Sequence, residues 1–343
     1  MECPVCGSDC VQPAPEILKD LLTRFRPCAR CRMRVLDKRI PILKPDYSEP
    51  CSCGRRFIDD VFLHMYVIMR EEGDLTSRDP LIAVGSPLIH PGFAMDRPPF
   101  LPGKSLLLLS GRIHEKAARR IVDEVPEVRG VVKTEAFVPG LVTCDTGAVP
   151  RVYTLLAGCD VRADIYPLAT GSLVVYKQQS CIHVEFPRAG YPKLRSIATH
   201  VKRTPVPLFV DACSGAGTLG LAAACLGVPH VVMNDAWYAS AFWSAFNIEV
   251  NRASFKVNDV QITGQVKDMA LEPVVREPKK IAKATGQQII EVYQGDFRNL
   301  DHVIPKGAHP VVALDIFDKN NPNTVSALLR ECQVRLGGDI FVP

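Results

Sequence analysis

The stretch from Leu208 to Asn251 constrains the fold more than any other part of this chain. It opens with an apolar run that ends at Asp211, and a turn of small residues follows. The chain then continues as an Ala- and Leu-rich segment without a helix breaker until Gly227. This order of residues predicts a strand, a tight turn and a helix.

The turn carries three glycines, Gly215, Gly217 and Gly220. Glycines at this spacing let the backbone approach a ligand closely and let the helix begin against the strand, although a tight turn without a ligand is the alternative. A second apolar run, Val231–Met233, ends at Asn234 and Asp235. Open α/β sheets bind ligands beyond the carboxyl ends of their strands, so this acid is a candidate to bind the hydroxyls of a ribose.

The first turn reads D-A-C-S-G-A-G, and the second strand reads V-V-M-N-D before a helix with Asn247 and Asn251. These motifs resemble those of class I S-adenosylmethionine (SAM) dependent methyltransferases, and the second resembles the archaeal-type tRNA guanine methyltransferases. The resemblance covers residues 191–343 and implies a Rossmann-like sheet, with the first acid near the methionine part of SAM and the second on its ribose. The SAM contacts that it implies in these two motifs are Asp211, Cys213, Ser214, Gly215, Gly217, Asn234 and Asp235.

Two later motifs extend the resemblance. Asp296 and Phe297 follow a third predicted strand, where the family holds the adenine with an acid and an apolar side chain. A fourth strand, 311–314, precedes the implied reacting groups Asp315, Phe317 and Asp318, which would orient the methyl acceptor or take its proton. Ile316 stands where amine-methylating relatives have proline, which leaves amine methylation open. After a fifth strand, 339–342, no sequence is evident for the sixth and seventh strands of a class I sheet.

Cysteines crowd the first 53 residues, where paired thiols have the spacing of zinc knuckles. The predicted metal ligands are Cys3, Cys6, Cys28, Cys31, Cys51 and Cys53. An iron–sulfur cluster or unligated thiols are the alternatives to zinc. Six paired cysteines do not make two tetrads, so either one pair is spare or Cys10, with or without His64, completes a second site. Cys144, Cys159, Cys181 and Cys332 are interpreted as buried apolar thiols.

The same segment is rich in basic residues, which within their span face only Asp37, Asp46 and Glu49. They are Arg24, Arg26, Arg30, Arg32, Arg34, Lys38, Arg39, Lys44, Arg55 and Arg56. The net charge of the whole chain, +4, is too small to indicate nucleic acid by itself. The local excess favours an RNA backbone as the partner, with a solvated or protein-facing surface as the alternative.

We therefore predict an α/β protein with four parts. Residues 1–70 form a zinc-ribbon-like module, 71–104 a Pro- and Gly-rich linker, 105–190 an intermediate α+β domain and 191–343 the SAM-binding Rossmann-like domain. In the intermediate domain we expect strands at 105–109 and 131–137 around a helix at 114–125, and a hairpin of 172–176 with 181–186. Residues 252–288 read as an excursion inserted between the second and third strands of the last domain.

The predicted function is SAM-dependent methyl transfer to RNA (tRNA or rRNA) docked by the zinc module. One alternative is methylation of a protein or small cofactor, and another is a non-catalytic SAM-fold adaptor that binds RNA or assists assembly. No apolar run approaches the roughly 18–20 residues of a membrane span, and Met1 is not followed by a signal-like segment. We expect a cytoplasmic protein without a membrane partner.

Overall fold

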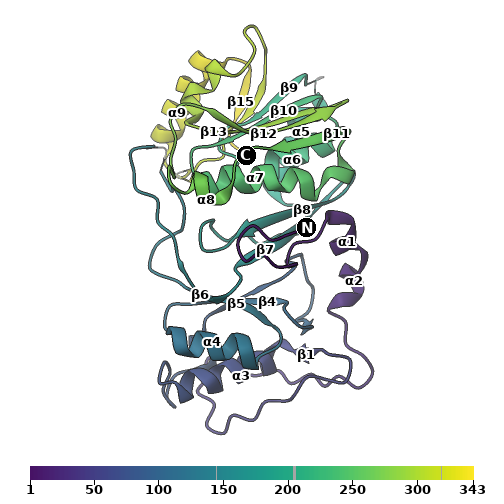
Figure 1. The fold of residues 1–343 in the computed structure, drawn as a ribbon, viewed down its shortest axis with the longest axis vertical. Helices are drawn as coiled ribbons and strands as arrows, with labels where there is room; N and C mark the ends of the chain where they lie inside the picture. Colours follow the sequence, from purple (N-terminus) through teal and green to yellow (C-terminus); the bar gives the residue numbers. More distant parts are fainter. Residues whose placement is uncertain (144, 204–205, 318) are drawn as a thin grey trace. The chain divides into compact units, whose positions relative to one another are not determined.

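The computed structural model describes residues 1–143, 145–203, 206–317 and 319–343 (Figure 1). The chain divides into two compact units. Unit 1 consists of Met1–Val11, Glu16–Phe137 and Tyr153–Asp164. Unit 2 consists of Gln12–Pro15, Val138–Val152 and Ile165–Pro343. Each unit is thus assembled from separate stretches of the sequence.

Unit 1 contains a four-stranded sheet in the order β2-β4-β5-β6. The strands are β2 (Ser86–Ile89), β4 (Leu106–Ser110), β5 (Val128–Lys133) and β6 (Thr154–Gly158). The central pair is parallel and the outer pairs are antiparallel. Helix α4 (Glu115–Glu124) connects the parallel strands, as the sequence predicted, and shares one hydrophobic core with helix α3 (Ile58–Glu71). Burial of these apolar faces is the main source of stability in this unit.

The cysteine-rich start of the chain has little regular structure. Its helices are α1 (Ala14–Lys19) and α2 (Leu21–Arg24), separated at Asp20, whose carbonyl accepts from the amide of Thr23. Strand β1 (Arg56–Phe57) pairs antiparallel with β3 (Phe100–Leu101). A segment with so few backbone pairs and so small a core of its own needs another source of order, and its thiols are the candidates.

The segment 71–104 differs from the predicted linker. Two of its stretches form strands, β2, which pairs with β4, and β3, which pairs with β1. A 3₁₀ helix, η1 (Leu81–Val84), lies in the chain between α3 and β2. Leu81, Val84 and Leu88 are fully or almost fully buried. The many prolines of the segment 71–104 indicated an irregular backbone. Proline is nevertheless compatible with an edge strand such as β2, because a residue at the edge need not donate an amide hydrogen bond to a neighbouring strand.

Unit 2 is organised on a seven-stranded sheet in the order β11-β12-β13-β10-β9-β14-β15. Its parallel strands are β9 (Leu208–Asp211), β10 (His230–Asp235), β13 (Ile289–Gln294), β14 (Val311–Ala313) and β15 (Asp339–Phe341). Numbered along the chain, these strands lie in the order 3-2-1-4-5, which is the doubly wound order of Rossmann-like sheets. The predicted α/β class with a Rossmann-like sheet at the C-terminal end is confirmed.

The inserted segment 252–288 adds two strands to this sheet, at the edge beyond β13. After the 3₁₀ turn η2 (Arg252–Ser254), it forms β11 (Val257–Ile262), the short helix α8 (Val266–Met269) and β12 (Lys279–Gly286). Strand β12 pairs antiparallel with β13, and β11 pairs antiparallel with β12. The sheet therefore gains its additional strands beyond the third parallel strand, and not beside the fifth, where the sequence suggested a gap.

The helices of unit 2 cover both faces of the sheet. Side chains alternate along a strand, so Val210 and Val232 share a core on one face with α9 (Pro322–Leu336) and η3 (Phe297–His302). Met233 faces the other way, toward α6 (Thr218–Cys225). A Cβ on Gly220 would lie 2.4 Å from Cγ of Met233, so glycine at this position is required for α6 to pack on β10.

Two buried asparagines, Asn247 in helix α7 (Tyr238–Val250) and Asn251 directly after it, bind the backbone of a neighbouring strand. Asn247 accepts from the amide of Tyr176 at 2.8 Å and donates to its carbonyl at 2.9 Å, and Asn251 makes the same pair of bonds with Val174. Both asparagines are fully buried, and Tyr176 and Val174 belong to β8 (Gly171–Gln178). The amide side chains therefore satisfy strand backbone that would otherwise lack partners.

The predicted hairpin is wrong in its partner strand. Strand β8 pairs with the preceding β7 (Val161–Leu168), while residues 181–186 form turn and coil that lead toward α5 (Pro192–Arg203). The polar Lys177 and Gln178 continue β8 instead of turning the chain. Gly171, at φ +138°, lies at the start of β8 beside the true turn.

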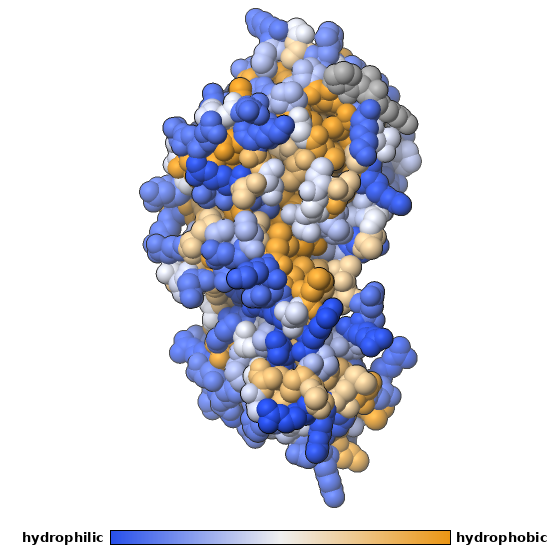
Figure 2. Space-filling view, turned by 90° about the vertical axis from the view of Figure 1, so that its right-hand side faces the viewer, coloured by the Kyte–Doolittle hydropathy of each residue, from blue (hydrophilic) through white to orange (hydrophobic). Residues whose placement is uncertain are grey.

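In the part of the chain that the structure describes, no helix is long and apolar enough to cross a membrane. On the face drawn in Figure 2, hydrophobic residues gather in several patches among hydrophilic ones.

Candidate functional site

A cavity of unit 2 lies at the carboxyl ends of four parallel strands and has a volume of about 430 Å³. Residues that follow β9, β10, β13 and β14 line it. From β9 the chain moves to β10 and β13 on one side and returns to β14 on the other. The cavity thus lies at the switch point of the sheet, where open α/β folds bind ligands.

Asp235 holds a fixed position at the end of β10. One carboxylate oxygen accepts from the amide of Gly215 and the other from the amide of Trp237, each at 2.9 Å. Burial raises the pKa of Asp235 to about 6, although these two amides act in the opposite direction. Since each carboxylate oxygen can accept more than one hydrogen bond, Asp235 still has acceptor capacity toward the cavity that it lines.

Four of the predicted cofactor residues line the cavity along the first turn and the third strand end, in addition to Asp235: Cys213, Ser214, Gly215 and Asp296. Phe297 also lines it and is 5% exposed, so its ring is a buried apolar wall. Asp296 accepts from the hydroxyl of Thr146 at 3.2 Å and from the amide of Arg298 at 3.0 Å. These contacts orient the carboxylate at the start of η3.

The other three predicted cofactor residues, Asp211, Asn234 and Gly217, are not among the residues that line the cavity. Asn234 is buried and donates to the carbonyls of Ala212 at 3.1 Å and Gly295 at 2.9 Å, so it ties together the two loops beside β10. Gly217 has a φ of +87° and precedes α6, where the left-handed backbone favours glycine. Asn234 and Gly217 thus have a structural role beneath the cavity.

Asp211 is fully buried behind the turn, where one of its oxygens accepts from the amide of Gly220 at 2.8 Å. Among the described residues, none donates a hydrogen bond to the other oxygen. Burial raises the pKa of Asp211 to about 8, and the nearby carboxylates of Asp315 and Asp235 act in the same direction. The folded protein therefore retains a proton that an unfolded aspartate loses near its usual pKa of 3.8.

This proton makes stability depend on pH. Because the folded pKa of Asp211 is raised, its contribution to stability is present at low pH and is lost as pH rises through about 8. An asparagine side chain cannot titrate, so Asp211→Asn should show a shallower fall in unfolding free energy between pH 6 and pH 8 than the wild type. Urea midpoints measured at several pH values in this window test the expectation. Parallel curves for the two proteins would contradict it.

Asp315 lies in a chain of alternating charges at the cavity wall. Lys193 donates to Asp315 at 2.7 Å and to Glu185 at 2.8 Å, and Lys177 pairs with Glu185 at 3.3 Å. Lys319 donates to the second oxygen of Asp315. Burial alone would raise the pKa of Glu185, but Lys177 and its other basic neighbours hold that pKa well below the usual value.

The structure places one of the two remaining predicted catalytic residues, Phe317, at the cavity. Phe317 lines the cavity, is 48% exposed and lies edge-on to His183, with ring centres 5.0 Å apart. Asp318 lies outside the described residues. Ile316, at the position where the resemblance led us to expect proline, lines the cavity but is largely buried in the core of the sheet face that α9 covers.

Sequence reasoning missed the lysine-containing wall of this site. The predicted hairpin of 172–176 with 181–186 places Lys177 in its turn, although a lysine at the end of the apolar run VVYK was a signal. Lys193 was not considered at all. It also missed residues 138–152, of which Pro139, Gly140, Leu141, Thr143 and Thr146 line the cavity. No motif marks these residues, because only the tertiary fold brings them beside the sheet.

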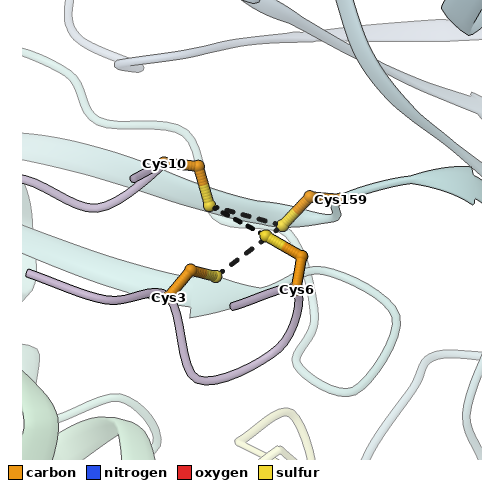
Figure 3. A group of neighbouring side chains, drawn as sticks. All are labelled: Cys3, Cys6, Cys10 and Cys159. Carbon is orange, nitrogen blue, oxygen red and sulfur yellow. Dashed lines mark hydrogen bonds between the residues drawn. The ribbon is translucent and has the colours of Figure 1, made fainter. Parts of the chain in front are cut away.

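Among the described residues, two groups of four thiols lie in unit 1, and the sulfurs within each group lie within 4.8 Å of one another. One group is Cys28, Cys31, Cys51 and Cys53, with neighbouring sulfurs at 3.5–3.7 Å. The other combines the predicted Cys3 and Cys6 with Cys10 and Cys159 (Figure 3). Thus the structure brings the six predicted ligands together in two sets, and sequence reasoning missed Cys159 as a member of either.

His64 belongs to neither group. Its ring stacks on Tyr47 with centres 3.8 Å apart, and its Nδ1 lies 3.1 Å from a guanidinium nitrogen of Arg56. Burial and the positive charge of Arg56 lower the pKa of His64 to about 4. It is a packed core histidine.

Several basic residues of the cysteine-rich segment are already paired with acids outside the span considered from the sequence. Arg34 contacts Asp60 at 2.6 Å and Lys38 contacts Asp59 at 2.7 Å. Arg56 is buried in an ion pair with Glu127. The basic residues that stay exposed are Arg26, Arg30, Arg32, Arg39 and Lys44. The basic surface is therefore smaller than the sequence suggested.

No family model and no curated protein matches the chain. Among solved structures, it is similar to aTrm5 in a complex with tRNA-Leu, at 12% identity over 80% of this chain and 62% of that one, with a TM-score of 0.39. Trm5b from Pyrococcus abyssi shares 16% identity over 69% and 57% of the respective chains (TM-score 0.36). TYW2 from P. horikoshii, in complex with MeSAdo, shares 19% over 56% and 60% (TM-score 0.32).

This chain spans 57% to 62% of the length of these three proteins. Similarity this low carries no functional conclusion. The chain's own sheet order and cavity are what relate it to the class I fold.

Proposed function

We propose that this protein is a SAM-dependent methyltransferase. The observation that carries the proposal is a carboxylate, Asp235, fixed by two backbone amides at the end of β10 and lining the cavity at the switch point of the sheet. An acid held in this way can accept hydrogen bonds from a ribose without further ordering. The cavity volume lies within the range of small-molecule sites, about 300–1,000 Å³.

The residues present fit SAM. Asp235 would hold the ribose hydroxyls, and Asp296 and Phe297 would hold the adenine by accepting a hydrogen bond and by covering its ring. Gly215 leaves open space where a side chain would stand, which suits close approach of a ligand to the first turn. SAM supplies an activated methyl group on a sulfonium.

The chain's own contribution to the reaction is positioning. Lys193 and Lys319 hold both oxygens of Asp315, so this carboxylate has one orientation at the cavity wall. The aromatic rings of Phe317 and His183, which also line the cavity, can hold a flat acceptor group. Alignment of an acceptor with the methyl group is the main requirement of an in-line displacement. Asp315 would orient the acceptor and receive a hydrogen bond from it.

We propose RNA as the substrate class because of the arginines that remain exposed beside the Cys28 thiol group. The decisive experiment is transfer of labelled methyl from SAM into cell extract, separated into RNA, protein and small molecules. Label in RNA supports the proposal, and label in protein or small molecules supports the corresponding alternative substrate. SAM binding without transfer to any fraction would favour the non-catalytic adaptor.

The docking surface can be tested by replacing Arg26, Arg30 and Arg32 with alanine. We expect weaker RNA binding, unchanged SAM binding, and a logarithmic salt slope flatter by about 0.7–0.9 for each lost phosphate contact. Arg34 is left intact because its pair with Asp60 is structural. Fluorescence anisotropy with labelled RNA at several salt concentrations measures both quantities.

A matched control removes the same charge elsewhere: Lys267, Lys306 and Arg330, which are exposed in unit 2, are replaced with alanine. This variant should retain the affinity and salt slope of the wild type. If the control loses RNA and the arginine variant does not, the docking surface is in unit 2 instead.

A further inference from the structure

Four thiols converge on one point of unit 1 from two distant parts of the chain (Figure 3). The sulfur of Cys10 lies 3.5 Å from that of Cys6 and 3.6 Å from that of Cys159. Cys3 lies 3.9 Å from Cys159, 156 positions away in the sequence. All four sulfurs lie within 4.8 Å of one another, so they surround a common centre.

The backbone fixes the first three thiols in a compact loop. The amide of Cys3 donates to the carbonyl of Ser8 at 2.8 Å, and the amide of Gly7 donates to the carbonyl of Cys3 at 2.9 Å. Gly7 has a φ of +70°, a conformation that favours glycine and lets the loop turn back toward Cys10. The loop thus directs the sulfurs inward, although residues 1–13 themselves form no helix or strand.

The fourth thiol is held by the sheet. Cys159 follows β6, and its amide donates to the carbonyl of Arg129 at 2.9 Å. A Cβ on the preceding Gly158 would lie 2.3 Å from the same carbonyl oxygen, so this close approach requires glycine. Arg129 is buried and donates to the carbonyl of Cys10 at 3.3 Å, which connects the loop to the sheet and places a cation beside the thiols.

We infer that Cys3, Cys6, Cys10 and Cys159 bind one structural zinc ion, separate from the ion expected at Cys28, Cys31, Cys51 and Cys53. A tetrahedral site with zinc–sulfur bonds of about 2.3 Å places its sulfurs about 3.8 Å apart, close to the separations found here. A disulfide would need about 2.05 Å, and the thiols are free. An iron–sulfur cluster puts several atoms between its cysteine ligands and needs wider spacing.

The fourth ligand, Cys159, lies outside the zinc module that the sequence predicted. The first CxxC knuckle, predicted to be part of a self-contained module at 1–70, takes its last ligand from the end of β6. Its ion would therefore join the start of the chain to the sheet of unit 1. This metal site depends on neither SAM nor RNA binding.

Metal content of the purified whole chain tests the second site directly. Elemental analysis and native mass spectrometry should give two zinc ions per chain. Cys159→Ala should retain one, and Cys28→Ala should also retain one, because each variant disrupts a different site. Cys225→Ala, a change outside both groups, should retain two. Cys159→His should hold more zinc than Cys159→Ala, since imidazole can replace thiolate as a ligand.

A second readout does not depend on variants. Gradual chelation of the wild type should expose residues 1–11 to hydrogen exchange as zinc leaves this site, while the amides of β4 and β5 stay protected. Two zinc ions in Cys159→Ala, or a single zinc in the wild type that Cys159→Ala retains, would overturn the inference. So would iron with acid-labile sulfide at these thiols.

Discussion

Asp235→Ala should weaken SAM binding roughly ten- to hundredfold, which corresponds to about 1.5–3 kcal/mol. The variant loses the carboxylate that would accept from the ribose hydroxyls. It also leaves the amides of Gly215 and Trp237 without their acceptor, so the first turn loses part of its order. Isothermal titration of SAM into the folded variant measures the change.

The control for this prediction is Asp301→Ala, which removes an exposed acid of η3 in the same unit. It should bind SAM as the wild type does. Asp235→Asn separates the two effects, because it keeps one oxygen acceptor but lacks the charge, and its affinity should lie between those of the wild type and the alanine variant. Wild-type affinity in a folded Asp235→Ala protein would remove Asp235 from the site.

Glu127→Ala should destabilise unit 1 by about 3–5 kcal/mol, because it leaves a buried guanidinium without its counter-ion. Arg56 donates to the two carboxylate oxygens of Glu127 at 3.1 and 2.5 Å, and both side chains are 1% exposed. Hydrogen exchange of amides in α3 and β5, measured on protein with its metal content verified, reports the loss within this unit.

Glu124→Ala is the matched control, since Glu124 pairs with Arg120 at an exposed surface. It should change exchange little, because solvent and salt screen such pairs. The double variant Arg56→Met, Glu127→Leu should recover most of the stability that Glu127→Ala loses, since it removes both charges of the buried pair. If Glu127→Ala and Glu124→Ala change hydrogen exchange equally, the buried pair contributes no more to the stability of unit 1 than the exposed pair does.

The sequence predicted the parallel strands of unit 2 well, because each combines an apolar run with a polar residue at its end. The strand at 208–211 and its helix were within a few residues of their observed bounds. Strands β11 and β12 could not be predicted, since many of their residues are exposed and polar and therefore resemble a loop. The partner of β8 was misassigned because two apolar runs flanked it at similar distances.

The candidate site was only partly predictable for a related reason. Asp235, Asp296 and Asp315 are recognisable because each follows a strand at a fixed place in the motif order. Lys193 and Cys159 have no such local signal, and their importance comes from neighbours more than a hundred positions away. Local patterns identify the groups at strand ends, whereas the side chains that orient them or complete their sets come from the tertiary fold.

The wall of the cavity that residues 138–152 form affects the stage of folding at which the site can be completed. Residues 138–152 belong to unit 2, yet they precede β9 in the chain, and Thr146 reaches Asp296, 150 positions later. During synthesis this segment leaves the ribosome before any strand of its sheet exists. Because contacts over such separations form late, the cavity should be among the last features to mature in a newly made chain. A fragment that begins at Ile165 would retain all strands of the sheet but lack this wall.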